Sequence, residues 1–153
     1  MNLLHLDDLA PGQRYDLGRT EVSEASIIAF AEAYDPQPFH IDPEAAGRSI
    51  YGGVIASGWQ TACLFMRLFF DGMLKRAAAM GSPGLDQLRW LLPVRPGDEL
   101  AASVEVIEVI PSRSKPDRGI AKLRCVMINQ TGAEVLAFVA NVMFKRREEP
   151  AAG

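Results

Sequence analysis

A helical segment from about Ser57 to about Arg76 constrains the fold of this chain more than any other stretch. Its residues are apolar over most of the helical circumference and leave only a narrow polar stripe, formed by Gln60, Arg67, Asp71 and Lys75. A helix of this composition has to be enclosed by other elements of the fold. The competing interpretation is a membrane span, but the last three polar residues interrupt the run well short of the roughly 20 apolar residues that a span needs. We therefore expect an enclosed helix and no membrane segment.

After this helix the pattern changes to a period of two, which is typical of half-buried antiparallel strands. Three alternating runs and a final, more continuously apolar run follow one another, at 87–92, 100–106, 121–127 and 135–144. The last run fits a strand nearer the centre of a sheet, and the turn residues 129–132 before it predict a hairpin.

The part of the chain before the long helix contains a shorter strand and a second helix. Residues 14–21 are expected to form a strand or extended arm, and Ser23 is expected to cap a helix that ends before Pro36. Together the elements predict an α+β fold in which an antiparallel sheet wraps around one long helix. An ordinary two-layer sandwich of helices on a sheet fits the same pattern.

The length and charge of the chain indicate one globular domain that does not bind nucleic acid. A chain of 153 residues falls in the one-domain range, so we expect a single domain over residues 1–153, with its core at about 14–146. The 16 Lys and Arg against 19 Asp and Glu give a formal charge of −3, which offers no electrostatic case for nucleic acid.

The first residues lack the features of a signal peptide, so we expect a cytoplasmic protein. The two cysteines have no metal-ligand or redox spacing, so we expect buried thiols, no metal and no cofactor.

An acid and a base lie close together before the long helix. Asp35 and His40 are separated by Pro36 and Pro38, and each proline restricts its own φ and the residue before it. The spacer is therefore expected to be extended and stiff, and to hold a carboxylate and an imidazole facing one point in space. That arrangement suits a reaction in which one group removes a proton and the other delivers one. A helix stop followed by a loop histidine without chemistry explains the same residues.

The segment 35–42 and the motifs after it resemble one enzyme family. Asp-x-x-Pro-x-His-x-Asp at 35–42 is followed by Glu-Ala-Ala at 44–46, by Ala-x-Gly at 56–58, and by Pro-Val-Arg-Pro-Gly-Asp at 93–98. In this order the motifs resemble the MaoC-like dehydratases, which include the (R)-specific enoyl-CoA hydratases of the hot-dog fold. The resemblance runs from about Ser23 to Phe144. The chain departs from the family pattern at Gln37, where Asn is usual, and at Ser57, where His is usual.

The resemblance implies the hot-dog arrangement and a hydratase or dehydratase that acts on acyl thioesters. It implies that Asp35 and His40 are the acid–base pair in the reversible addition of water to a trans-2-enoyl-CoA, which gives a 3-hydroxyacyl-CoA. It also implies that the N–H of Gly58 polarises the thioester carbonyl, in a homodimer or a multiple of dimers whose sheets join edge to edge. From the residues alone, Gly58 fits equally an oxyanion site at a helix N-terminus and a glycine that allows close packing. The carrier, coenzyme A or acyl carrier protein, stays open.

Five further residues are candidates for contacts with the substrate. Ser57 either donates a hydrogen bond to it or caps the helix, and we favour the cap. Gln37 is expected to shape the loop more than to contact the substrate, and Cys63 to line the pocket or the core. Arg113 and Lys115, in a loop between two strands, would meet the phosphates of coenzyme A, although a solvated hairpin loop explains these charges as well.

Two functions of other classes involve the same kind of ligand. A hot-dog thioesterase would hydrolyse the thioester, and the Asp35–His40 pair argues against it. A non-catalytic binder of acyl thioesters would keep the pocket without the chemistry, and the departures at Gln37 and Ser57 leave that function open.

Overall fold

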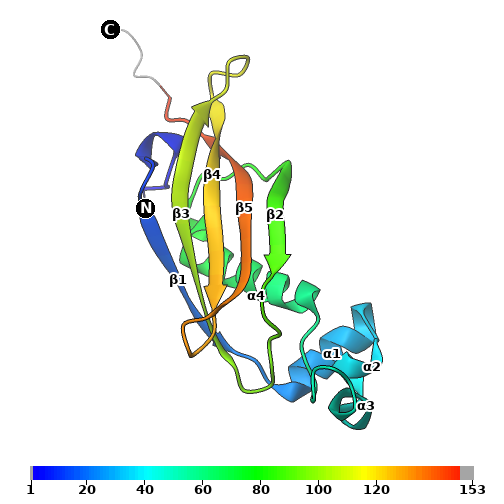
Figure 1. Ribbon diagram of the computed structural model, residues 1–153. Coiled ribbons are helices and arrows are strands. Elements are labelled where there is room, and N and C mark those ends of the chain that lie inside the picture. Colours follow the sequence, from blue (N-terminus) through cyan, green and yellow to red (C-terminus); the bar gives the residue numbers. More distant parts are fainter. Residues whose placement is uncertain (1, 149–153) are drawn as a thin grey trace, which may run out of the picture.

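The computed structural model describes residues 2–148, which form one antiparallel sheet of five strands with a long helix across one face (Figure 1). The strand order is β1-β3-β4-β5-β2, so that β1 and β2 are the two edges. The strands are β1 Arg14–Glu21, β2 Gly84–Trp90, β3 Glu99–Pro111, β4 Arg118–Ile128 and β5 Glu134–Lys145. The predicted strand at 14–21 and the interior position of the last strand are both confirmed.

The long helix α4, Gly58–Gly72, packs one side against the sheet. Its buried residue Phe65 meets Phe138 of β5 edge to face, with the ring centroids 4.9 Å apart. The expected continuation of the helix to Arg76 is wrong, because the chain leaves the helix at Met73 and forms the 3-10 turn η2, Leu74–Arg76. At this end a Cβ on Gly72 would lie 2.7 Å from the Cα of Leu17, so only glycine lets the helix cross β1 so closely. None of the helices in residues 2–148 combines the length and the hydropathy needed to cross a membrane.

A single chain covers only one side of α4. Trp59, Met66 and Phe70 are 58%, 50% and 45% exposed, so full enclosure of the helix is wrong for one chain. Cys63 on the same side is exposed, contrary to the expected buried thiol. Cys125 of β4 is buried as expected, and burial raises its pKa to about 12. Between α4 and β2 the exposed side forms an apolar groove of about 330 Å³.

The edge strand β2 contains a bulge that decides which way its side chains point. Leu85 pairs with Ala140 and Trp90 with Leu136, but the register shifts by one residue between Asp86 and Arg89. Gln87 at this bulge has a φ of +56°. In a regular strand residues 85 and 90 would point to opposite faces, because they are five positions apart. The extra residue places both on the face that carries α4.

Three short helices lie together beyond one end of the sheet (Figure 1). They are α1 Glu24–Tyr34, α2 Pro38–Ile41 and α3 Pro43–Gly47. The predicted cap of α1 is confirmed, because the Ser23 hydroxyl accepts a hydrogen bond of 3.1 Å from the N–H of Ser26. Asp42 caps α3 in the same way, by accepting the N–H groups of Glu44 and Ala45.

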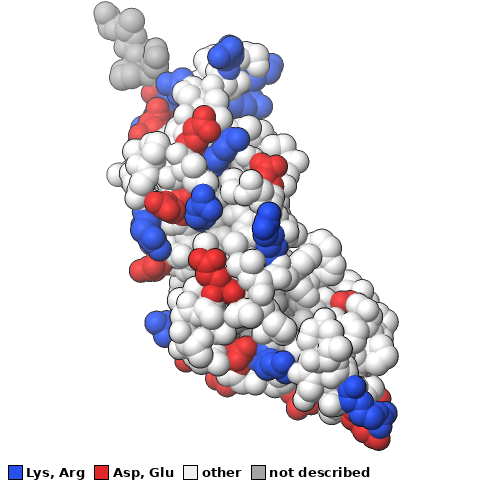
Figure 2. All heavy atoms as spheres, in the orientation of Figure 1, with Lys and Arg blue, Asp and Glu red and all other residues white. Residues whose placement is uncertain are grey.

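The two hairpin loops of the central strands lie at opposite ends of the sheet. The predicted turn at 129–132 is confirmed, with the Asn129 side chain accepting N–H groups of Thr131 and Ala133 and with Gly132 at a φ of +82°. The loop from β3 to β4 lies at the far end from α1–α3 (Figure 1). Figure 2 shows acidic and basic side chains interspersed over the outer face of the sheet, and basic side chains gathered at the end that carries this loop.

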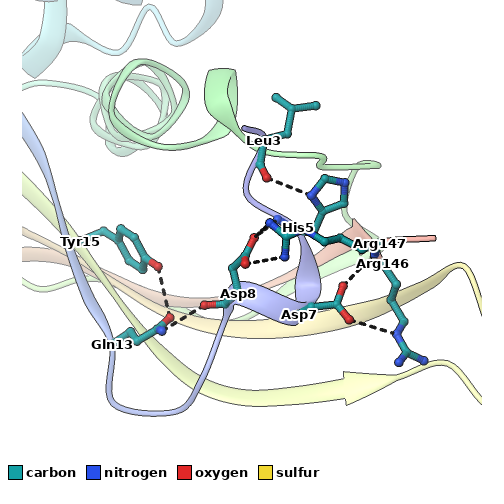
Figure 3. Close-up of polar contacts among 8 residues, drawn as sticks. All are labelled: Leu3, His5, Asp7, Asp8, Gln13, Tyr15, Arg146 and Arg147. Carbon is teal, nitrogen blue, oxygen red and sulfur yellow. Dashed lines mark hydrogen bonds and ion pairs between the residues drawn. The ribbon is translucent and has the colours of Figure 1, made fainter. Parts of the chain in front are cut away.

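A polar cluster ties the first turn of the chain to the residues after β5 (Figure 3). In the 3-10 turn η1, Leu6–Asp8, the carboxylate of Asp8 accepts two hydrogen bonds from the Arg147 guanidinium, at 2.6 and 2.8 Å. Asp7 accepts the backbone N–H of Arg147 at 2.8 Å, and Arg146 lies 3.8 Å from the same carboxylate. The hydrogen bonds from Arg147 hold the pKa of both carboxyls below the ordinary value.

Replacing Arg147 by Met is expected to make thermal unfolding less sensitive to acid. A carboxyl whose pKa is lowered by folding stabilises the fold above its unfolded pKa, near 3.8, and this stabilisation is lost as the pH falls through the folded pKa. Without the guanidinium, the fall in Tm from about pH 5 to about pH 2 should be shallower than in the wild type. Melting curves at fixed ionic strength measure this slope, and Arg146→Met, which removes only a long contact, is the matched control. Equal slopes for wild type and Arg147→Met would contradict the prediction.

Candidate active site

Asp35 is the residue directly after α1, where the chain leaves the helix. Its N–H still bonds the carbonyl of Ala31 at 2.8 Å, while its side chain contacts the next segment. One carboxylate oxygen accepts a hydrogen bond of 2.7 Å from the Gln37 side-chain amide, and the other lies 3.2 Å from Nε2 of His40. Gln37 therefore orients the acid, in line with its expected role in shaping the loop. Contact of Gln37 with a substrate stays a prediction.

His40 lies in the one-turn helix α2, so the expected extended spacer is wrong beyond Gln37. Pro38 takes the first helical position, where its missing N–H and fixed φ fit the helix. The N–H of His40 then bonds the carbonyl of Gln37 at 2.9 Å. The helical turn shortens the separation along the chain and brings the imidazole to the carboxylate of Asp35.

A backbone carbonyl fixes the tautomer of His40. Its Nδ1 lies 2.6 Å from the carbonyl oxygen of Ile55, and its side chain is only 6% exposed. A carbonyl oxygen can only accept a hydrogen bond, so Nδ1 carries a proton. Nε2, which faces Asp35, is therefore the ring nitrogen that can exchange a proton. With a proton on Nε2, the contact of 3.2 Å is an ion pair.

The surroundings of Asp35 keep its carboxyl ionised. Burial raises the pKa of this carboxyl, but hydrogen bonds from Gln37 and Ser57 and the neighbouring His40 lower it. The lowering contributions are together the larger, so the pKa lies below the ordinary value of 3.8. At neutral pH the site therefore holds a carboxylate beside the imidazole.

Ser57 and Gly58 begin α4 next to this pair. The fully buried Ser57 accepts the N–H of Trp59 at 3.3 Å, which confirms the predicted cap. Gly58 is the first residue of the helix, so its N–H has no acceptor within the helix and lies at the positive end of the helix dipole. A Cβ on Gly58 would lie 2.5 Å from the Trp90 ring, which confirms that close packing also requires glycine here. The oxyanion role of its N–H stays a prediction.

The acid, the base and the helix start line one cavity of about 460 Å³. Sequence reasoning missed several of the other lining residues, among them Phe39, Tyr51, Thr61, Trp90 and Leu91. The motif at 93–98 gave a partial signal, because its first two residues also line the cavity. Within residues 2–148, no group of three or more His, Cys, Asp and Glu side chains is arranged to hold a metal ion.

Three of the predicted substrate contacts lie away from this cavity. Cys63 lines the apolar groove between α4 and β2 instead. Arg113 and Lys115 are in the loop from β3 to β4, at the opposite end of the sheet (Figure 1). One chain therefore does not bring these two cations to the Asp35–His40 pair.

The comparisons with known proteins agree with the motifs. The family described as MaoC like domain matches residues 7–125. The chain belongs to the MaoC-like family. Its structure matches the crystal structure of the MaoC-like dehydratase from Rhodospirillum rubrum with a TM-score of 0.90, at 44% identity, over 95% of this chain and 99% of that one. The (R)-specific enoyl-CoA hydratase of Aeromonas caviae is 34% identical over 128 residues, which are 82% of this MaoC-like chain and 87% of the hydratase.

The hot-dog fold is confirmed for this MaoC-like protein. A Mycobacterium tuberculosis protein described as having a double hot-dog fold matches with a TM-score of 0.82 at 19% identity, over 99% of this chain and 47% of its own. At that identity the match concerns the fold alone. The α+β prediction, with an antiparallel sheet around a central helix, is confirmed together with the family.

Proposed function

We propose that this MaoC-like protein is a hydratase or dehydratase that adds water reversibly to a trans-2-enoyl-CoA and gives a 3-hydroxyacyl-CoA. The observation that carries the proposal is the Asp35–His40 pair, with 3.2 Å between carboxylate and imidazole, in one cavity with the free N–H end of α4. The 34% identity to a protein named (R)-specific enoyl-CoA hydratase supports the same reaction.

The three groups divide the chemistry as follows. The thioester carbonyl accepts the N–H of Gly58, which stabilises the negative charge that develops on its oxygen. Asp35 and Nε2 of His40 hold a water molecule between them and the substrate. Its oxygen bonds C3, one of its protons passes to the pair, and the pair delivers a proton to C2, so that the reverse order of steps is dehydration. Ser57 supports Asp35 and caps α4 rather than meeting the substrate.

Turnover of a panel of enoyl thioesters by the purified protein tests the proposal. Loss of the conjugated double bond should be measured spectroscopically with short and medium trans-2-enoyl chains, on both coenzyme A and acyl carrier protein. Release of free thiol would instead indicate a thioesterase. Binding without turnover of any thioester would favour the non-catalytic binding protein.

We further propose a homodimer in which two β2 edges join the sheets. An edge strand presents unpaired backbone groups, and β2 is exposed along nearly its whole length. The exposed apolar side of α4 and the groove of about 330 Å³ adjoin this edge. A second copy would cover these surfaces, and apolar patches rimmed by polar residues are typical of such contacts.

In sedimentation equilibrium at micromolar concentration, we expect about twice the chain mass of 16.7 kDa. Met66→Glu, which places a charge on the exposed apolar side of α4, should shift the population toward monomer because the carboxylate would be buried without a partner. Ile107→Glu on β3, where the side chain is 38% exposed, is the control that should stay dimeric. A wild type that sediments as a monomer would contradict the proposed dimer.

In this dimer, the two cations predicted to contact phosphate would lie at the same end of the joined sheet as the cavity of the other chain. Antiparallel pairing of two β2 strands inverts the second copy, so its loop from β3 to β4 would lie at the end of the joined sheet that carries α1–α3. We therefore keep Arg113 and Lys115 as candidates for the phosphates of coenzyme A, supplied to the site by the second chain. Guanidinium and ammonium groups are the usual partners of phosphate.

A further inference from the structure

Trp90, the last residue of β2, lies directly on the first residue of α4. A Cβ built on Gly58 would be 2.5 Å from Cε2 and 2.6 Å from Nε1 of the indole, so the ring fills the place of a side chain. The indole Nε1–H also donates a hydrogen bond of 2.7 Å to the carbonyl oxygen of Gly58. The first residue of the helix is therefore held by contact and by a hydrogen bond from the same ring.

Two other features keep the indole in this position. The bulge at Gln87 places Trp90 on the face of the sheet that carries α4, opposite Leu136. Trp59 also meets the ring edge to face, with centroids 5.1 Å apart and an interplanar angle of 78°. Both tryptophans line the cavity of Asp35 and His40.

Both peptide groups that flank the Cα of Gly58 are hydrogen-bonded. The carbonyl of Ser57 accepts the N–H groups of Gln60 and Thr61, at 2.9 and 3.2 Å. The carbonyl of Gly58 is bound by Trp90. Glycine has the widest backbone freedom of all residues, and the first turn of a helix is where helices fray. Without the indole, the peptide group after Gly58 would lose the side-chain donor that restrains the orientation of this residue.

We propose that Trp90 is a positioning residue that aims the N–H of Gly58 at the thioester carbonyl. This role rests on the proposed function, in which that N–H stabilises charge on the carbonyl oxygen. Such stabilisation depends on donors that are already in place before the reaction. A small displacement of the donor therefore lowers the rate more than it lowers substrate affinity.

The first test is Trp90→Phe, which keeps an aromatic ring on Gly58 and removes the N–H donor. We expect kcat with an enoyl thioester to fall about 10-fold, a fraction of the effect of removing an oxyanion donor outright, with KM changed less than about 2-fold. Arg89→Ala, the neighbouring position on the opposite face of β2, is the matched control for disturbing the strand. A kcat equal to that of Arg89→Ala would overturn the role of Trp90.

A spectroscopic measurement separates positioning from general stability. Butyryl-CoA is saturated and cannot be hydrated, so the infrared stretch of its ¹³C-labelled carbonyl can be followed in the bound state. In the wild type the hydrogen bond from Gly58 should lower this frequency relative to free butyryl-CoA, and Trp90→Phe should reverse part of the shift. A purely structural role would leave the carbonyl frequency of the folded variant unchanged.

A third measurement needs no turnover. Gly58→Ala should lower Tm sharply in the wild type, because the new Cβ meets the indole, and much less in a Trp90→Ala background. Gly53→Ala, where a Cβ would meet only the Arg95 guanidinium at 3.8 Å, is the control for the glycine change. Equal losses of Tm in both backgrounds would show that the indole does not hold Gly58, and would overturn the proposal.

The outcomes separate the two proposals. A wild type that neither binds butyryl-CoA nor turns over any enoyl thioester overturns the proposed function, and the positioning role with it. An active wild type whose kcat and bound carbonyl frequency are unaffected by Trp90→Phe overturns the positioning role alone.

Discussion

Asp35→Asn and His40→Ala should each lower kcat for hydration of a trans-2-enoyl thioester by about 10²–10⁴, the usual range for loss of a general acid or base. Asp35→Asn keeps the size of the side chain, but its amide cannot take a proton from water. His40→Ala removes Nε2, the ring nitrogen that faces Asp35 and can exchange a proton. Initial rates and thioester binding, measured separately, give the effect on kcat apart from affinity.

The double variant, Asp35→Asn with His40→Ala, gives a second test of this prediction. Because the two groups serve one reaction complex, removing both should cost much less than the product of the single effects. Asp42→Asn is the matched control, because Asp42 is a nearby carboxylate that caps α3 and does not line the cavity. Near-normal turnover by Asp35→Asn in an active protein would show that the mechanism proposed here is wrong.

Phe65→Ala should lower the free energy of unfolding by about 3–5 kcal/mol, the usual cost of deleting a fully buried aromatic ring. Phe65 is 1% exposed and lies between Phe69 of the same helix and Phe138 of the sheet, at 5.8 and 4.9 Å between ring centroids. Its loss would leave a cavity at the centre of the contact between α4 and the sheet. Denaturant unfolding at one fixed protein concentration measures the change, since association with a second chain also affects apparent stability.

The control for this prediction is Tyr34→Ala, which removes an aromatic ring that is 77% exposed on α1. Its cost should stay below about 1 kcal/mol, as for most surface positions. Comparable losses for the two variants would mean that packing of α4 on the sheet is not what stabilises the fold.

The sequence predicts those parts of the fold that depend on local patterns. The strand at 14–21 was expected as a strand or extended arm, and the Ser23 and Ser57 caps and the turn at 129–132 follow from side chains that bond the neighbouring backbone. All of these are confirmed. The pairing of Asp35 with His40 was predicted as well, but the backbone conformation expected between them was wrong. The prolines suggested an extended spacer, whereas Pro38 starts a helical turn.

These local patterns could not predict features that depend on tertiary contacts. The bulge at Gln87 has no glycine to mark it, and β2 spans Gly84–Trp90 instead of the expected 87–92. The contact of Trp90 with Gly58 joins residues 32 positions apart and needs the folded sheet to exist. The exposed side of α4 was missed because apolar composition alone does not say whether the same chain or a second one covers it.

The contact between Asp8 and Arg147 makes the fold a candidate for circular permutation. It brings the two ends of the described chain side by side, away from α1–α3 (Figure 1). A short linker between these ends, with new termini opened in the turn at 129–132, would leave every strand beside its present neighbours. The permuted order would run from β5 through the linker to β1 and end with β4, so that all residues from Asp35 to Val94 that line the cavity would stay in one uninterrupted stretch. Chain order and catalytic layout are thus separable in this protein.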